Sequence, residues 1–223
     1  AERLDLDWTV LNGTNNITEL VIDRDYRYGN QKSICQNTVK KVTLGQHVTR
    51  VPEYACYHMS LDELNISANV TTIGNNAFMY CTFPEGYTFP FAQIKTIENG
   101  AFYVCSSLPA NIDLTGVESI GENAFRNSNV QTVKLSSSLT TLDKYVFSNC
   151  DNLTAINIPS SINSFTDNTF QYCNALTNVT FDYSSTALTL EDGTFSKATN
   201  LTIDRKISGD TPFSTTKVAK VAL

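Results

Sequence analysis

A repeat of 22 to 25 residues runs along nearly the whole of this 223-residue chain and decides the kind of fold it can adopt. The inward aromatic or apolar slot of the repeat, with successive spacings of 22, 22, 24, 23, 22, 23 and 25, falls at Ile34, Cys56, Phe78, Phe102, Phe125, Phe147, Phe170 and Phe195. A fixed period in this range predicts a solenoid, in which each repeat forms one coil and contacts only its neighbours.

The first half of each repeat has the pattern of a strand. Apolar residues lie two apart, as in Val133 and Leu135 or Ile156 and Ile158. Residues two apart on an extended strand point to the same face, so the residue between them faces solvent. Stacked coils would therefore form a parallel sheet along one side of the solenoid.

The second half of the repeat reads I-G-x-N-A-F-x-x-C in its clearest copies, Ile73 to Cys81 and Ile120 to Phe125, the latter with Ser128 in the Cys position. The Ala, Phe and Cys lie one and three residues apart, which fits a short helical turn. Acidic or amide side chains suit the first turn of a helix, and they are found at Asn75, Asn99, Glu122, Asp167 and Asp192. The expected fold class is therefore an α/β solenoid of about eight to nine coils.

These patterns together resemble a known family. The combined motif L-x-x-[IV]-x-[IL]-[PS]-x-x-[VI]-x-x-I-G-x-x-A-F-x-x-C, seen in Leu64 to Cys81, Ile112 to Phe125 and Leu153 to Cys173, is similar to the BspA-like, or Treponema pallidum type, leucine-rich repeat. The resemblance covers about residues 17 to 200. It implies a right-handed horseshoe or rod with a parallel β-sheet on one face and short helical turns or loops on the other. It also implies a secreted or surface-attached protein, usually bacterial and sometimes from a parasitic protist, that binds proteins or host surfaces.

Three departures from the family pattern affect the prediction. Cys56 replaces the inward aromatic residue, Ser128 replaces the Cys, and residues 82 to 93 form a longer, aromatic-rich turn. The flanking segments, 1–16 and 204–223, leave the repeat. We therefore expect an N-terminal cap at 1–16, a repeat domain at 17–203, and at 204–223 a C-terminal cap or a link to a further domain.

The composition argues against some classes of binding partner. The net charge is −6 and no basic cluster occurs, which argues against nucleic acid because phosphate binding depends on Lys and Arg. No apolar run approaches the 18 residues of a membrane span, and we expect a soluble monomer. The polar start, Ala1 to Leu4, lacks a signal peptide and reads as a chain whose export signal has been removed.

Four of the six cysteines occupy the same repeat slot: Cys81, Cys105, Cys150 and Cys173. Side chains in one column point alike, so we expect buried, reduced thiols that behave as small hydrophobic groups. One or more disulfides between adjacent coils is the alternative, and metal binding is a weaker one, because no Cys/His cluster has ligand spacing. Cys35 follows an inward slot and is expected to be more accessible.

The sequence offers little for catalysis. Its two histidines, His47 and His58, belong to no H-E-x-x-H motif, and neither G-x-S-x-G nor a phosphate-binding glycine loop occurs. We interpret both histidines as solvated or capping residues. The S-x-x-K spacing of Ser214 and Lys217 lacks its companion motifs and is a coincidence. We expect no enzyme activity, no catalytic residue, no metal and no cofactor.

Binding is expected on the outward face of the strands, which offers many short hydrogen-bonding side chains. The predicted binding residues on this face are Asn65, Asn111, Asp113, Lys134, Asn157, Thr180 and Asp182. The alternative interpretation is an ordinary hydrated sheet. A second candidate is the aromatic-rich turn, where Tyr87 and Phe89 would fill inward strand slots and leave Phe83 and Phe91 as an exposed pair that marks an interface.

The leading functional hypothesis is a noncatalytic secreted or cell-surface protein that mediates adhesion by binding a protein or host-matrix ligand, with glycan also considered. The runner-up is a scaffold or glycan-binding accessory domain of a larger extracellular assembly, and an enzyme comes third. Seven N-x-[ST] sequons occur, but most arise because the repeat itself places Asn and Thr around an inward aliphatic residue.

Overall fold

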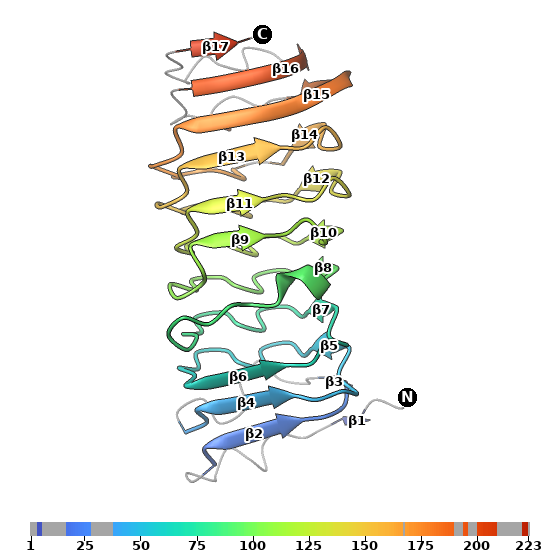
Figure 1. Cartoon of the computed structure of the whole chain (residues 1–223), viewed down its shortest axis with the longest axis vertical. Helices are drawn as coiled ribbons and strands as arrows, with labels where there is room; N and C mark the ends of the chain where they lie inside the picture. Colours follow the sequence, from blue (N-terminus) through green and yellow to red (C-terminus); the bar gives the residue numbers. More distant parts are fainter. Residues whose placement is uncertain are drawn as a thin grey trace.

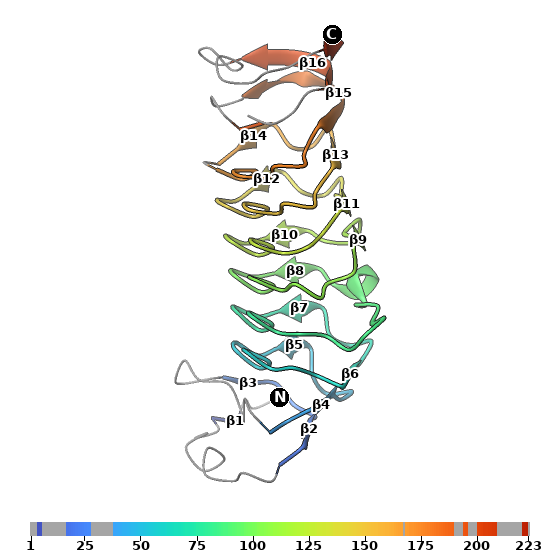
Figure 2. The same ribbon diagram turned by 90° about the vertical axis from the view of Figure 1, so that its left-hand side faces the viewer.

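The computed structural model describes residues 4–5, 17–27, 38–166, 168–189, 194–195, 200–208 and 220–222. Within these ranges the chain winds into coils that stack along one long axis, with β2 near one end and β17 at the other (Figure 1). Figure 2 shows the coils from the side, where each lies nearly parallel to the next. The predicted solenoid is confirmed.

The longer strands form the first of two ladders, which we call the first ladder. Its N-terminal part contains β2 (Glu19–Ile22), β4 (Lys41–Leu44) and β6 (Glu63–Ile66), all parallel. After an interruption at residues 82 to 93 it resumes with β9 (Asn111–Asp113), β11 (Thr132–Lys134), β13 (Ala155–Ile158), β15 (Asn178–Thr189), β16 (Asn200–Ser208) and β17 (Lys220–Ala222). Burial alternates as predicted along β4, β9, β11 and β13, and Val133 of β11 is buried between exposed Thr132 and Lys134.

The second ladder consists of short strands on another side of each coil. It contains β5 (Arg50–Val51), β7 (Thr72–Ile73), β8 (Thr96–Ile97) and β10 (Ser119–Ile120), and then β12 (Thr141–Leu142) and β14 (Ser164–Phe165), which joins the far end of β15. A separate parallel pair joins β1 (Leu4–Asp5) to β3 (Tyr26–Arg27). The sequence predicted a sheet on one face only, and the structure adds this second set of strands.

The predicted helical turns are wrong, and with them the α/β description. Among the described residues the only helix is a single 3-10 turn, η2 (Phe91–Gln93). The I-G-x-N-A-F-x-x-C segment instead forms consecutive β-turns, in which Ala77 N–H donates to Gly74 O at 3.2 Å and Cys81 N–H to Phe78 O at 3.0 Å. The intervening amides donate to the next coil, as Phe78 N–H does to Ala101 O at 2.9 Å. We call this stack of hydrogen-bonded corners the turn column.

Two positions in each corner have a positive φ, which explains how the turn column forms. These positions flank the inward Ala-Phe pair, as at Asn76 (φ 52°) and Tyr80 (φ 57°). A residue with φ > 0 in the third position of a β-turn is the mark of a type II turn. Because alternate amides then point toward the neighbouring coil, they cannot donate within a helix.

The core is a stack of aromatic rings along the axis. Phe78, Phe102, Phe125, Phe147 and Phe170 are buried, and successive rings lie 5.3 to 5.8 Å apart with interplanar angles of 10° or less. This arrangement confirms the register that the sequence predicted for the inward slot.

The cysteine prediction is confirmed for the described residues: Cys56, Cys81, Cys105, Cys150 and Cys173 are free and buried. Three thiols donate to a carbonyl of the preceding coil, and Cys150 Sγ lies 3.2 Å from Phe125 O. Burial raises the pKa of Cys56 to about 12 and that of Cys150 to about 11. Cys35, Asp167 and Asp192 lie outside the described residues.

The predicted domain boundaries remain predictions. The strand β16 continues past position 203 to Ser208, and β17 pairs with it in parallel register. The ladder therefore extends into the segment expected to leave the repeat, while the capping role of either terminal segment is untested.

Candidate binding surfaces

Four predicted residues form one column on the first ladder. The register places Asp113, Lys134, Asn157 and Thr180 side by side on β9, β11, β13 and β15. All four are exposed. Lys134 Nζ lies 3.5 Å from Asp113 Oδ2, and Thr180 Oγ1 donates to Asn157 Oδ1 at 2.7 Å.

The other predicted residues extend or leave this column. Asp182 accepts a hydrogen bond from Asn157 Nδ2 at 3.1 Å, and Asn111 accepts one from Thr132 Oγ1 at 2.6 Å. Asn65 lies on β6, beyond the interruption, where its Nδ2 donates to Glu63 Oε1 at 2.9 Å. The structure therefore brings six of the seven polar residues together, and we call Asn111, Asp113, Lys134, Asn157, Thr180 and Asp182 the polar face.

The polar face carries opposite charges that are only loosely paired. Hydrogen bonds from the Thr115 hydroxyl and backbone N–H, with the nearby charge of Lys134, lower the pKa of Asp113. Exposed ion pairs contribute little to stability, and the Lys134 and Asp113 side chains are 71% and 59% exposed. Both groups can therefore turn toward a ligand at small energetic cost.

The expectation for the aromatic pair is wrong. Phe83 and Phe91 are 3% and 5% exposed, and Phe83 lies against Phe78 while Phe91 lies against Phe89 and Phe102. Ser107 Oγ accepts a hydrogen bond from the Phe83 backbone at 2.7 Å. Both rings fill the core of a widened coil, so neither can form the predicted interface.

The widened coil also lacks its first-ladder strand. Pro84 O accepts from Tyr87 N–H at 3.1 Å, and Gly86 has φ 70°, which makes a type II turn where a strand would begin. Phe91 N–H then donates to Phe89 O at 2.8 Å around Pro90, whose φ of −79° and ψ of 59° define an inverse γ-turn. The prediction that Tyr87 and Phe89 lie on a strand is therefore wrong, although Phe89 does point inward.

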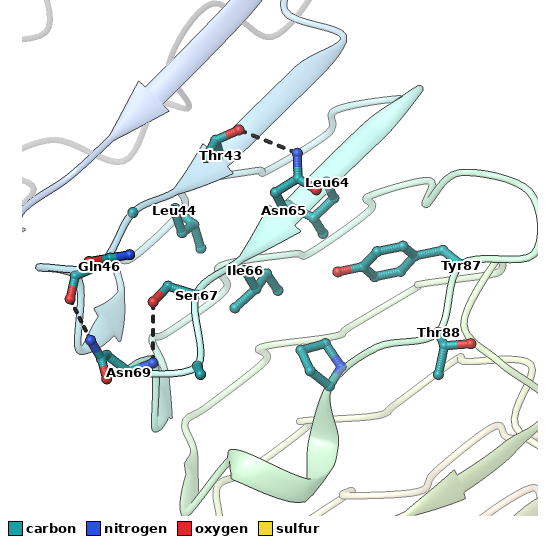
Figure 3. A pocket seen from close by; sticks show the side chains of 13 residues that line it. Thr43, Leu44, Gln46, Leu64, Asn65, Ile66, Ser67, Asn69, Tyr87 and Thr88 are labelled. Carbon is teal, nitrogen blue, oxygen red and sulfur yellow. Dashed lines mark hydrogen bonds between the residues drawn. The ribbon is translucent and has the colours of Figure 1, made fainter.

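An open groove of about 740 Å³ occupies the place of the missing strand. The strand β6 and the end of β4 form one side, and Tyr87, Thr88 and Pro90 form the other. Figure 3 shows the Tyr87 ring pointing across the groove toward Ile66. This groove was not predicted from the sequence, although Pro84, Gly86 and Pro90 at expected strand positions indicate it.

The outer edge of the turn column carries a row of aromatic and cationic side chains that was not predicted from the sequence. The rings of His58 and Tyr80 stack at 4.3 Å, Tyr103 lies 5.8 Å from Tyr80, and the Arg126 guanidinium lies 4.9 Å from the Tyr145 ring. His58 and Tyr80 are exposed, and Tyr103, Arg126 and Tyr145 are half-buried. Because they contact one another, they stabilise adjacent corners. The other histidine, His47, bonds to Asp23 at 2.9 Å.

The described residues hold neither a metal cluster nor a membrane-spanning helix. They contain no group of three or more His, Cys, Asp or Glu side chains placed to hold a metal ion. No helix within these residues is long and apolar enough to cross a bilayer.

The fold and the repeated corner together define a parallel β-solenoid repeat protein. Six copies of the repeat described as "BspA type Leucine rich repeat region" match residues 6–85 and 84–202, so the chain belongs to this leucine-rich repeat family. The resemblance seen in the sequence is confirmed. No curated protein sequence matches the chain significantly.

Solved structures of other leucine-rich repeat proteins are similar to this chain. A leucine-rich repeat protein from Bacteroides ovatus superposes with a TM-score of 0.57 at 22% identity, covering 91% of this chain and 62% of its own. A leucine rich cell surface protein from Faecalibacterium prausnitzii gives a TM-score of 0.45 at 22% identity, covering 85% of this chain and 65% of its own. The chain thus spans less than two thirds of either protein. At this identity, the similarity to the Bacteroides ovatus protein shows the fold alone.

Proposed function

We propose that this chain is a noncatalytic protein-binding domain of a secreted or cell-surface protein, and that the polar face is its main contact with a protein or matrix ligand. The observation that carries the proposal is the in-register column of Asp113, Lys134, Asn157 and Thr180, which presents charges and short polar groups from consecutive strands on a rigid support. Membership of a leucine-rich repeat family, whose members are generally noncatalytic scaffolds, supports it.

The geometry suits recognition of an extended polar surface. Adjacent strands in a sheet lie about 4.8 Å apart, so the column offers a donor or acceptor at each step along the rod. The backbone that carries these side chains is held by neighbouring strands and loses little freedom on binding, which favours affinity. Electrostatic complementarity would contribute specificity through the exposed Asp113 and Lys134.

The test is a binding screen of the chain against immobilised host-matrix proteins and a glycan array. The variant Asp113→Ala, Lys134→Ala, Asn157→Ala is expected to weaken binding to any positive protein by about tenfold or more, because charge-assisted contacts contribute about 1.5 to 3 kcal/mol each. Its stability should change by no more than about 0.5 kcal/mol per site, since all three side chains are exposed.

A matched control is available on another side of the rod. Lys95 and Glu118 form an exposed pair at 3.3 Å next to the second ladder, and Lys95→Ala with Glu118→Ala removes the same charges without touching the polar face. This control should bind as the wild type does. Equal loss in both variants, or no loss in the triple variant, would show that the polar face is not the binding surface, and exclusive binding to glycans would favour an accessory-domain role.

A further inference from the structure

The edge of β6 that faces the groove has unpaired backbone groups. Glu63 N–H donates to Lys40 O at 3.2 Å and Ser67 N–H to Leu44 O at 3.0 Å, so these residues face β4. Successive residues of a strand direct their backbone groups to alternate sides, and Leu64 and Ile66 therefore face away from β4. In the described structure no strand pairs with β6 on that side, and no backbone group donates to or accepts from them there.

The chain's own neighbouring segment does not fill this position. The type II turn at 84–87 and the γ-turn at Pro90 keep residues 84 to 91 out of the ladder, and η2 lies beside β9. The groove separates the β6 edge from Tyr87, Thr88 and Pro90. Tyr87 is only partly buried.

We propose that an extended segment of a partner protein binds in this groove as an added strand, pairing with Leu64 and Ile66 of β6. The occupant must be a polypeptide, because only an extended backbone repeats an N–H and a C=O on one side every two residues, about 6.6 to 6.8 Å apart, as the β6 edge does. The in-register ladder that ends at β6 would thereby gain one further strand.

The lining of the groove defines the side chains that the segment should carry. Inward side chains would meet Ile66, Tyr87 and Pro90, which favours small or β-branched apolar residues, and outward ones would lie beside Asn65, which favours short polar residues. The chain's own strands have this alternation, as in Thr132, Val133 and Lys134. This inference rests on the proposed protein-binding function but uses a surface separate from the polar face.

The probe is a fluorescein-labelled synthetic peptide, Val-Gln-Thr-Val-Lys-Leu-Ser, which copies residues 130 to 136. We expect saturable binding to the whole chain by fluorescence anisotropy. In the variant Ile66→Pro, which removes an amide that faces the groove and is not used by β4, affinity should fall about tenfold, the effect of one lost hydrogen bond in a buried pairing. Ile66→Val keeps the amide and should bind as the wild type does.

N-methylated peptides test the mode of binding on unaltered protein, so the result stands even if Ile66→Pro fails to fold. Strand addition uses amides on one side of the peptide only. One peptide is methylated at the amides that correspond to Thr132 and Lys134, and the other at the amide that corresponds to Val133. One of the two should bind about tenfold more weakly than the unmethylated peptide, and the other should bind with unchanged affinity. Absence of saturable binding, or equal effects of the two methylations, would overturn the proposal.

The result is independent of the polar face. The Asp113→Ala, Lys134→Ala, Asn157→Ala variant should bind the peptide with unchanged affinity, because none of its side chains lines the groove. Loss of peptide binding in this variant would place the peptide on the polar face and contradict the groove as its site.

Discussion

At the scale of single residues, the corners of the solenoid impose an unusual requirement on the sequence. Each described corner has two positions with positive φ, and these hold Asn in several coils, with Gly100 in another. Glycine and asparagine tolerate this conformation, whereas a β-branched residue there is strained. Val104, with φ 56°, occupies one of these positions, and its backbone is held in place because Val104 N–H donates to Arg126 O at 2.8 Å.

Replacing Val104 should therefore stabilise the protein. Val104→Asn is expected to increase the free energy of unfolding by about 1 kcal/mol, since a left-handed conformation costs an ordinary L-residue about 1 to 2 kcal/mol. The melting temperature should rise by about 2 to 4 °C. The reverse change at the equivalent position of the next coil, Asn127→Val, should lower it, and an unchanged melting temperature in both variants would show that these corners are unstrained.

The buried thiols give the stability a dependence on alkaline pH. Burial raises the pKa of Cys150 from an ordinary value near 9.0 to about 11. The unfolded chain therefore loses this proton near pH 9, while the folded chain keeps it until about pH 11. Between these pH values, deprotonation stabilises the unfolded chain but not the folded one. The free energy of unfolding is therefore at its full value below pH 9 and falls as the pH rises toward 11.

The variant Cys150→Ser isolates this contribution. Serine suits the slot because Ser128 already occupies it in the preceding coil, 3.4 Å from Cys150 Sγ. Between pH 8 and pH 10 the wild type should lose about 1 kcal/mol more than the variant in urea denaturation. The same pH dependence in both proteins would contradict neutral burial of the Cys150 thiol.

At the scale of elements, close approach between coils explains one recurring glycine. A Cβ on Gly74 would lie 2.5 Å from Val51 O and 3.1 Å from Arg50 Nη2 of the preceding coil. The same Arg50 spans the coil of Gly74 and pairs with Glu98 of the coil beyond, with 2.6 Å between Nη2 and Oε2. The Ile-Gly of the repeat therefore reflects the short distance between β5 and β7.

The substitution Gly74→Ala should destabilise the chain by about 1 to 3 kcal/mol, the usual cost of overpacking. The control is Gly86→Ala, because nothing lies within 4 Å of its Cβ position and only the φ of 70° opposes it. Thermal unfolding should rank Gly74→Ala as the less stable variant. The opposite order would show that the coils can separate at little cost.

The sequence predicted those elements whose form is set by burial. Alternation along β11 and the inward slot of Phe125 follow from which residues must leave water, and both are confirmed. The corner could not be predicted from burial. Its backbone amides can donate either to a carbonyl of the same turn or to a carbonyl of the next coil, and the second acceptor lies about 23 residues away in the sequence. The prediction for Phe83 and Phe91 failed because it counted strand slots in a coil where Pro90 prevents a strand.

The two candidate surfaces also differ in whether they could be predicted from the sequence. Register alone brought Asp113 and Lys134 together, so the polar face could be predicted as a column, although its role in binding remains a prediction. The groove beside β6 arises where one coil lacks its strand. The apolar spacing of the repeat predicts where strands lie and does not show where one is missing. Pro84 and Gly86 are the residues that indicate it, because they favour a turn at the position of a strand.

At the scale of the whole molecule, the interruptions of the two ladders do not coincide. Among the described strands, the first ladder has no pairing between β6 and β9, where the second ladder joins β7 to β8. The second ladder has no pairing between β10 and β12, where the first joins β9 to β11. The turn column crosses both places, with Phe78 N–H donating to Ala101 O at 2.9 Å and Phe125 N–H to Val146 O at 3.0 Å.

This arrangement predicts that the described coils unfold together. Solenoids are stabilised by contacts between neighbouring coils. From the coil of β4 to the coil of β13, every pair of neighbouring coils is joined by at least two of three features: a ladder, the turn column and the Phe stack. Cys81 and Cys173 report on the two halves of the rod because both thiols are buried. In a denaturant series with brief thiol labelling, the two should become reactive at the same midpoint.

Weakening the centre should separate the two halves. Phe125 lies 5.3 Å from Phe102 and 5.5 Å from Phe147 and is fully buried, so Phe125→Ala should cost about 3 to 5 kcal/mol. Phe125 lies beside the interruption of the second ladder between β10 and β12. Because its loss weakens the contact between the two halves there, the labelling midpoints of Cys81 and Cys173 should diverge. Tyr183→Ala, at a side chain 69% exposed, should leave them coincident. Coincident midpoints in Phe125→Ala would mean that coupling through the first ladder and the turn column is sufficient to hold the rod together as one cooperative unit.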